Sequence, residues 1–342
     1  MARLNTICAE VHRLQTRGQQ VLIVSSGAIA LGRRQLDLSR NQRRLDYHQS
    51  AAAAGQVLLI RAYHDIFEQF QIKTAQILLT LDDTENRKRY LNARATLENL
   101  LELGAMPIVN ENDSVATDEI RYGDNDRLAA RVALMISADC LILLSDVAGL
   151  YDADPEIDKN ARLIPIVETL DAKIDAVAGE SRTEFGSGGM VTKVAAARIC
   201  IPAGCATVIA SGLVENPLTN IEDGGPCTWF LPKTTPQAAR KQWIAGTLTP
   251  KGSLHIDAGA MDALLRGRSL LAVGITAVSG EFDRGDPVTV HGPDRVELAR
   301  GLVAYSSQET ELIKGKHTDA TEEILGYCGR KAVVHRDDMV LL

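Results

Sequence analysis

The sequence predicts an α/β protein with an open, mostly parallel doubly wound sheet, followed by a small, mostly β domain. Continuous apolar runs alternate with segments of helical periodicity through the first two thirds of the chain. From about residue 252, short β-rich runs replace this alternation. A chain of 342 residues is also long for one compact core, which indicates two domains.

The first domain is predicted to begin with a helix, because Leu4, Ile7 and Val11 recur at helical spacing and Gly18 ends the pattern. Further helices are expected at about 50–70, 84–103 and 128–136. The apolar runs expected as strands are Gln20–Val24, Ala75–Leu81, Met106–Val109, Cys140–Leu144 and Ala206–Ala210.

A turn at Asp223–Pro226 and several later prolines mark the end of this domain. We therefore place the first domain at 1–232, a linker at 233–250 and the second domain at 251–342. One short helix, Ala258–Leu265, is expected among the strands of the second domain. Those strands are predicted at Ser253–Ile256, Ala272–Val278, Pro287–His291, Leu302–Tyr305 and Ala332–His335.

Composition narrows the class of protein. An apolar content of 45% is that of an ordinary globular chain, and a net charge of −7 argues against nucleic-acid or membrane affinity. We find neither a signal peptide nor an apolar run of about 18 residues, so we expect a cytoplasmic protein. The six cysteines have no CxxC spacing, which predicts reduced thiols, with Cys140 as a small buried hydrophobic residue.

The strand ending at Val24 runs into Ser25, Ser26 and Gly27. Small residues between a strand and a helix let backbone N–H groups approach an anion. A tight turn without a ligand explains the same residues equally well.

Two acidic and amide clusters follow the strand that ends at Val109. They are Asn110–Ser114 and Gly123–Asp126, and they precede a helix. Loops at the ends of parallel strands are where α/β proteins build their sites. Asn and Asp also favour turns for local reasons, but two such clusters in tandem indicate a site for a polar ligand that bears an amine.

Gly186–Lys193 opens another helix and is rich in glycine, although it lacks the residue order of a P-loop. Its glycines allow the backbone to wrap phosphates, and Lys193 lies in the first helical turn. The alternative is a flexible loop with a solvated lysine. Ser145 and Asp146 end a buried run and could contact a base or ribose, or form only a structural turn.

Taken in order, these motifs resemble the amino-acid kinase family, in particular its members that phosphorylate the γ-carboxylate of L-glutamate with ATP in the first step of proline biosynthesis. The end of the chain, Val334–Met339 included, resembles a PUA domain. The kinase motifs that carry the resemblance are Val24–Ala30, Asn110–Ala116, Gly123–Asp126, Ser145–Tyr151 and Gly186–Lys193.

The resemblance implies a role for each matching residue. Lys193 and Asp126 would be catalytic, the lysine offsetting phosphoryl charge and the aspartate orienting it. Mg²⁺ would be held mostly by ATP phosphates, so no protein ligand is assigned. The glutamate-binding residues would be Ser26, Gly27, Asp113, Asp124 and Asn125. The ATP-binding residues would be Ser145, Asp146, Ser187, Gly188, Gly189, Met190, Val191, Thr192 and Lys193.

The family also implies a homo-oligomer, a dimer or tetramer, and feedback inhibition by proline. Its members begin with a strand carrying a Lys-x-Gly-Ser type motif, whereas this sequence starts within the following helix. We expect either that Met1 is an internal methionine of a longer product or that the protein is a degenerate kinase. The resemblance implies that the lysine of this motif is a second lysine at the phosphate site, and that lysine is absent from the sequence as given.

Two other functions remain open from the sequence. One is an amino-acid sensor that binds glutamate or proline without transferring phosphate. The other is an RNA-binding protein acting through the PUA-like domain. Acidic residues outnumber basic ones between 251 and 342, which disfavours binding to a phosphate backbone and favours a structural or regulatory domain.

Overall fold

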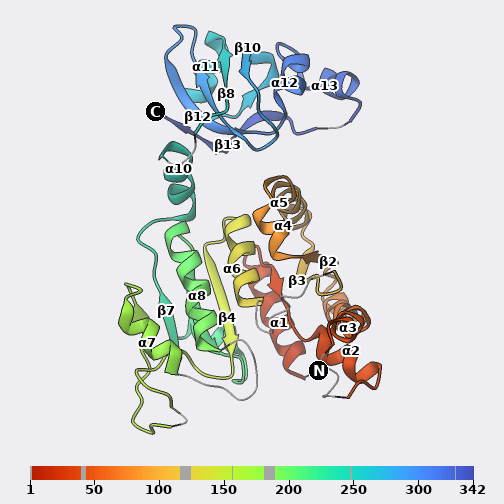
Figure 1. Cartoon of the computed structure of the whole chain (residues 1–342), viewed down its shortest axis with the longest axis vertical. Helices are drawn as coiled ribbons and strands as arrows, with labels where there is room; N and C mark the ends of the chain where they lie inside the picture. The colour runs from red at the N-terminus through yellow and green to blue at the C-terminus, as the bar shows by residue number, and fades with distance from the viewer. Residues whose placement is uncertain are drawn as a thin grey trace. The chain divides into compact units, whose positions relative to one another are not determined.

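A computed structural model of the chain describes residues 2–39, 44–115, 125–155, 157–180, 189–246, 249–327 and 329–342. The chain divides into a first unit, Met1–Lys233, and a second unit, Thr234–Leu342. Strands and helices alternate along the first unit, and short strands dominate the second (Figure 1). The predicted α/β class, with a smaller β-rich domain after it, is therefore confirmed.

The helices of the first unit are α1 Ala2–Thr16, α2 Ala28–Gln35, α3 Leu45–Gln69, α4 Leu81–Glu85, α5 Arg87–Glu102, α6 Asn125–Met135, α7 Ala172–Glu180, α8 Met190–Cys200 and α9 Pro217–Glu222. Its strands are β1 Ile23–Val24, β2 Thr74–Leu79, β3 Met106–Glu111, β4 Cys140–Ser145, β5 Ile166–Val167, β6 Ala206–Ser211 and β7 Cys227–Phe230. Local chemistry sets several boundaries: Thr80 and Asp83, for example, form a reciprocal capping box that starts α4.

These strands form two hydrogen-bonded sheets. The first has the order β1-β3-β2 and is entirely parallel. The second has the order β4-β6-β7-β5, in which β6 and β7 are antiparallel and the other pairs are parallel. Helix α6 contacts β1, β3 and β4, and so packs on both sheets. In both sheets the parallel strands end in loops at the same edge, which is where the polar motifs lie.

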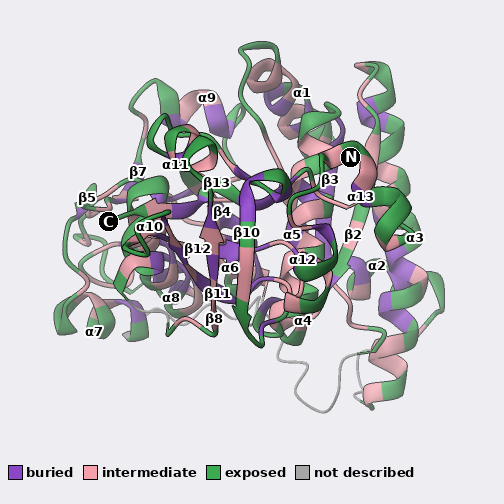
Figure 2. Ribbon diagram, turned by 90° about the horizontal axis from the view of Figure 1, so that it is seen from above, coloured by how far each residue is buried: buried purple, intermediate pink, exposed green. Residues whose placement is uncertain are grey.

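Three apolar clusters fill the first unit where the structure describes it. One of them joins the strands of both sheets, since it contains Met106 and Ile108 of β3 together with Val208 and Ala210 of β6. Buried and exposed faces alternate around α2 and α3, as Figure 2 shows in purple and green. Cys140 was predicted to be buried, and this was wrong: as the first residue of β4, it is exposed at the end of the strand.

Helices α2 and α3 pack with their backbones in direct contact. A Cβ atom added to Gly32 would lie 1.7 Å from the carbonyl oxygen of Ala51, and one added to Gly55 would lie 1.8 Å from that of Ala28. Only glycine permits this approach, because any side chain would force the helix axes apart.

We therefore expect Gly55→Ala to reduce the free energy of unfolding by about 1–3 kcal/mol, the usual cost of overpacking. Urea denaturation measures this value. Gly179→Ala is the matched control, because a Cβ on that helical glycine meets nothing within 4 Å and should leave stability equal or slightly higher. Equal stability for Gly55→Ala and the wild type would contradict the close packing of α2 on α3.

The second unit is one six-stranded sheet with the order β10-β8-β11-β12-β13-β9, covered by short helices. Its strands are β8 Gly252–Ile256, β9 Leu270–Leu271, β10 Ile275–Gly280, β11 Pro287–His291, β12 Glu297–Val303 and β13 Ala332–Leu341. Its helices are α10 Pro236–Gly246, α11 Ala258–Leu265, α12 Ser307–Ile313 and α13 Thr318–Leu325.

The prediction of a single short helix in this domain was wrong, because α12 and α13 are also present. Helices of seven or eight residues contain too few turns to show a clear period. The readable signal was the pair Ser306 and Glu309, which forms a capping box at the start of α12.

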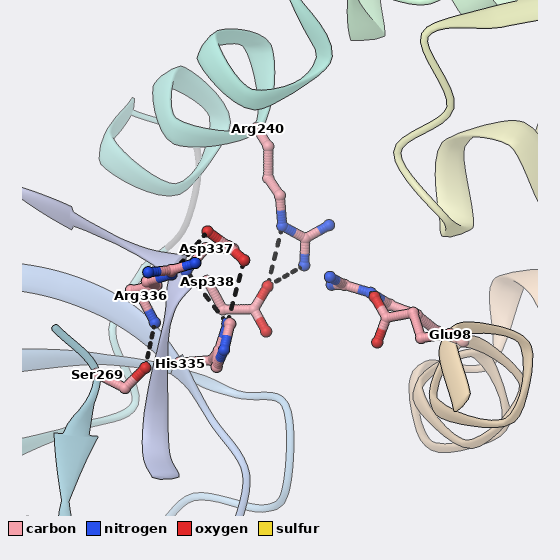
Figure 3. A network of polar contacts seen from close by, with 8 residues as sticks. Glu98, Arg240, Ser269, His335, Arg336, Asp337 and Asp338 are labelled. Atoms are coloured by element: carbon pink, nitrogen blue, oxygen red, sulfur yellow. Dashed lines mark hydrogen bonds and ion pairs between the residues drawn. The ribbon is translucent and has the colours of Figure 1, made fainter. Parts of the chain in front are cut away.

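Helix α10 lies within the segment 233–250 that was predicted as a linker, and it packs against β12 and β13. Arg240 on α10 donates two hydrogen bonds to Asp338 Oδ1 on β13, at 3.0 and 2.5 Å (Figure 3). Both side chains are largely buried, with 14% and 9% exposed. A charge-assisted pair with little exposure holds the helix to this sheet.

Candidate functional site

The carboxyl ends of β1 and β3 form the first part of the candidate site. The strands pair in register at Val24 and Val109, and Ser25 N–H donates to Val109 O at 2.9 Å. Gly27 then takes a left-handed conformation, with φ 99°, at the N-cap of α2. Ser26 and Gly27 are consequently exposed in a sharp turn beyond the strand end. Their position suits backbone contact with a ligand.

Asn125, the first residue of α6, connects this turn to β3. Its Nδ2 donates to the carbonyl oxygen of Ser25 at 3.2 Å and to Asn110 Oδ1 at 3.3 Å. Its Oδ1 is buried and has no hydrogen-bond partner within the described part of the chain. An unsatisfied buried acceptor costs about 1–3 kcal/mol, so it is typically explained by a ligand or a bound water.

Asp113 lies two residues beyond the end of β3 and is half-buried. Burial disfavours its charged form and raises the pKa of this carboxyl to about 6. A cation brought beside such a carboxylate stabilises its charged form more than it would stabilise that of a solvated carboxylate. This environment is typical of a residue that binds a charged ligand.

An ion pair between α6 and α8 forms the second part of the site. Lys193 Nζ lies 3.1 Å from Asp126 Oδ2, with 10% and 18% of the two side chains exposed. Thr192 Oγ1 lies 2.7 Å from the same carboxylate oxygen. Gly189 is the N-cap of α8, so Met190 and Val191 begin the helix and their N–H groups have no intrahelical acceptor. A shielded lysine beside a helix N-terminus is suited to an anionic ligand.

Ser145 and Asp146 lie at the end of β4, in the second sheet. Ser145 Oγ donates to Asp146 Oδ1 at 3.0 Å, and Gly212 N–H donates to Ser145 O at 2.7 Å. The turn that follows is held by buried Thr228, whose Oγ1 accepts from Leu150 N–H at 2.8 Å. This turn is therefore tied to β7 by a hydrogen bond that the turn donates.

The structure places Asn125 in contact with Ser25 and Asn110. It also places the next residue of α6, Asp126, in contact with Lys193, so the two parts of the candidate site meet at the start of this helix. Asp124, Ser187 and Gly188, which were also predicted as site residues, lie outside the described residues. Sequence reasoning missed Gln56 and Tyr63 of α3. Both are buried and hydrogen-bonded to the site, and the one signal was a glutamine within an apolar, alanine-rich helix.

Within the described ranges, no group of three or more His, Cys, Asp or Glu side chains could hold a metal ion. None of the helices described is long and apolar enough to cross a membrane.

Comparison with known proteins identifies the class. Residues 1–211 match the amino acid kinase family and residues 252–325 match the PUA domain. The chain belongs to the amino acid kinase family.

Its relatives include proteins named Glutamate 5-kinase. The one from Paramagnetospirillum magneticum is 56% identical over 338 residues, which cover 99% of this chain and 91% of that protein. Those from Bradyrhizobium sp. and Rhizobium etli are each 54% identical over 99% of this chain, and the matches cover 89% and 87% of those proteins.

Proposed function

We propose that this protein transfers the γ-phosphoryl group of ATP to the γ-carboxylate of L-glutamate, releasing ADP and γ-glutamyl phosphate, in the first step of proline biosynthesis. Identity above 50% to proteins named Glutamate 5-kinase, over nearly the whole chain, supports this activity. The structural observation that carries it is the shielded ion pair between Lys193, in the first turn of α8, and Asp126 of α6.

Phosphoryl transfer depends mainly on positioning and on neutralising charge, without a covalent nucleophile on the protein. Lys193 Nζ would offset negative charge on the transferring group, and Asp126 would orient it from 3.1 Å away. Gly189 to Thr192 would hold the phosphates through backbone N–H groups at the start of α8. Ser187 and Gly188 would also bind the phosphates.

Glutamate would bind at the ends of β1 and β3. Its ammonium would pair with the carboxylate of Asp113 and donate to the unpartnered Oδ1 of Asn125. Ser26 and Gly27 would supply contacts from the turn that opens α2, and Asp124 would shape the loop before α6. This assignment accounts for two unusual features, the half-buried carboxylate of Asp113 and the buried Oδ1 of Asn125, which has no partner among the described residues.

Ser145 and Asp146 would contact the nucleotide from the end of β4. Mg²⁺ binds typically through phosphate oxygens, waters and one or two carboxylates. We propose that ATP itself carries this ion, with no protein ligand assigned to it. The ion would supply further charge neutralisation on the phosphates.

We also infer, from the family resemblance, a cytoplasmic homo-oligomer, dimer or tetramer, that proline inhibits. We assign residues 1–232 to the kinase domain and 251–342 to a PUA-like domain with a structural or regulatory role.

Glutamate- and ATP-dependent release of ADP tests the activity, with hydroxylamine trapping of the acyl phosphate as a second readout. L-Aspartate in place of L-glutamate is the control for substrate length. Glutamate binding by calorimetry with neither ADP nor hydroxamate would refute the kinase and favour the amino-acid sensor. A gel shift with RNA at physiological salt would favour the RNA-binding alternative.

The raised pKa of Asp113 predicts a dependence of glutamate binding on pH. Below about pH 6 the carboxyl is protonated and loses its attraction for the ammonium, so kcat/KM for glutamate should fall as pH drops through that value. Above that pH the carboxyl is fully ionised, and its ionisation no longer makes kcat/KM depend on pH. Initial rates at subsaturating glutamate, from about pH 5 to about pH 8, measure the curve. Asp113→Asn should remove the acid limb, and an unchanged limb in that variant would assign it to another group.

A further inference from the structure

A chain of three side-chain amides, from the buried residues Gln56 and Asn110 and the partly buried Asn125, connects helix α3 to the glutamate site. Asn110 Nδ2, at the end of β3, donates to Gln56 Oε1 of α3 at 2.8 Å. Asn110 Oδ1 accepts from Asn125 Nδ2 at 3.3 Å. The residues Gln56 and Asn110 are only 8% and 2% exposed. The Asn110 amide therefore lies between Gln56 on one side and Asn125 on the other.

Two backbone groups determine how these amides are oriented. Glu111 N–H donates to Asn110 Oδ1 at 2.9 Å, so the Nδ2 of Asn110 must face Gln56 and meet its oxygen. The carbonyl oxygen of Ser25 accepts from Asn125 Nδ2, so Asn125 Oδ1 must point away from it. A backbone N–H only donates and a carbonyl only accepts, which excludes the flipped amides.

This arrangement leaves two buried atoms without partners in the described part of the chain, Gln56 Nε2 and Asn125 Oδ1. A buried network with unsatisfied ends is less stable than an apolar one of the same shape. An apolar side chain at residue 56 would suit an apolar core better. The network's position beside the strand ends indicates that it serves the site.

Helix α3 is also well placed to act as a rigid support. Its Gly55, next to Gln56, packs directly on the backbone of α2. Tyr63, about two turns along the same face, forms a buried hydrogen bond of 3.0 Å with Ser25. One helix therefore holds residues at the ends of both β1 and β3.

We propose that Gln56 is a positioning residue for glutamate. Its Oε1 holds the amide of Asn110, and Asn110 holds Asn125 in the orientation that presents Oδ1 to the ligand ammonium. This inference rests on the proposed function for the identity of the ligand, but its geometry does not depend on phosphoryl transfer.

Gln56→Met removes the acceptor and keeps the length of the side chain. We expect KM and Kd for glutamate to rise about tenfold, the effect of losing one ordering hydrogen bond, with kcat and KM for ATP within about twofold. Gln56→Asn withdraws the acceptor by one methylene but remains polar, and it should show the same rise. Leu59→Ala, a buried position on the same helix, should lower the melting temperature without this change in KM.

A double-mutant cycle with Asn110→Ala tests the route of the effect. Because Gln56 acts through Asn110, adding Gln56→Met to Asn110→Ala should raise KM for glutamate by less than about twofold more. Full additivity would overturn the proposal, as would unchanged KM and Kd in both Gln56 variants. If the wild type binds glutamate without releasing ADP, the kinase assignment fails while the Kd comparison still decides the role of Gln56.

Discussion

Lys193→Ala is expected to lower kcat by about 10²–10³, the usual cost of removing one donor that stabilises transition-state charge. The KM for glutamate should change little, because Lys193 lies in the first turn of α8 rather than at the ends of β1 and β3. An interaction made mainly in the transition state reduces kcat and kcat/KM together. Steady-state kinetics with each substrate varied in turn measure this difference.

The lysine variant needs a control for stability, since Asp126 would lose its ion-pair partner but keep its hydrogen bond from Thr192. Lys193→Met keeps the apolar stem and should show the same loss of kcat with a near-normal melting temperature. Lys173→Ala removes an exposed lysine from α7 and should behave as wild type. Full turnover in Lys193→Ala would show that the phosphate site has been assigned to the wrong residues.

Asp113→Ala is expected to raise the KM for glutamate by about 10- to 100-fold while kcat changes much less. A hydrogen bond to a charged group contributes about 1.5–3 kcal/mol, and each 1.4 kcal/mol is tenfold in affinity. The half-buried setting of this carboxyl, which raises its pKa to about 6, places the expected rise in KM toward the upper end of that range. Solvent screens the attraction between the carboxylate and the ammonium less in such a setting. Calorimetric titration of glutamate separates this loss of binding from any loss of turnover.

Asp262→Ala, on α11 of the second unit, removes an exposed carboxylate and serves as the matched control. Its glutamate KM should equal that of the wild type. If Asp113→Ala instead lowers kcat and keeps the wild-type KM, the ammonium has a different partner, and Asp113 belongs to the transfer step.

The apolar runs and the helical periods were enough to predict the α/β class, because burial of one face imposes a repeat that any continuous segment displays. The predicted run Met106–Val109 lies within β3, and the helix expected at 128–136 is the body of α6. The turn at Gly27 could also be predicted from the sequence, because a sharp turn between a strand and a helix favours glycine, which readily adopts a positive φ.

Contacts between distant segments were decided only by the tertiary structure. Lys193 and Asp126 are 67 positions apart, and Asn110 and Gln56 are 54 apart. The division of the strands into two sheets and the antiparallel direction of β7 likewise depend on which strands meet.

Periodicity and capping act between residues a few positions apart, so the sequence by itself predicted the main strands and the longest helices of the first unit and the loops that we propose as its site. A hydrogen bond between two side chains depends on the packing of whole helices and strands around it, which no short segment encodes. Only the folded chain could therefore place Gln56 within hydrogen-bonding distance of Asn110 and leave the oxygen of Asn125 without a partner among the described residues.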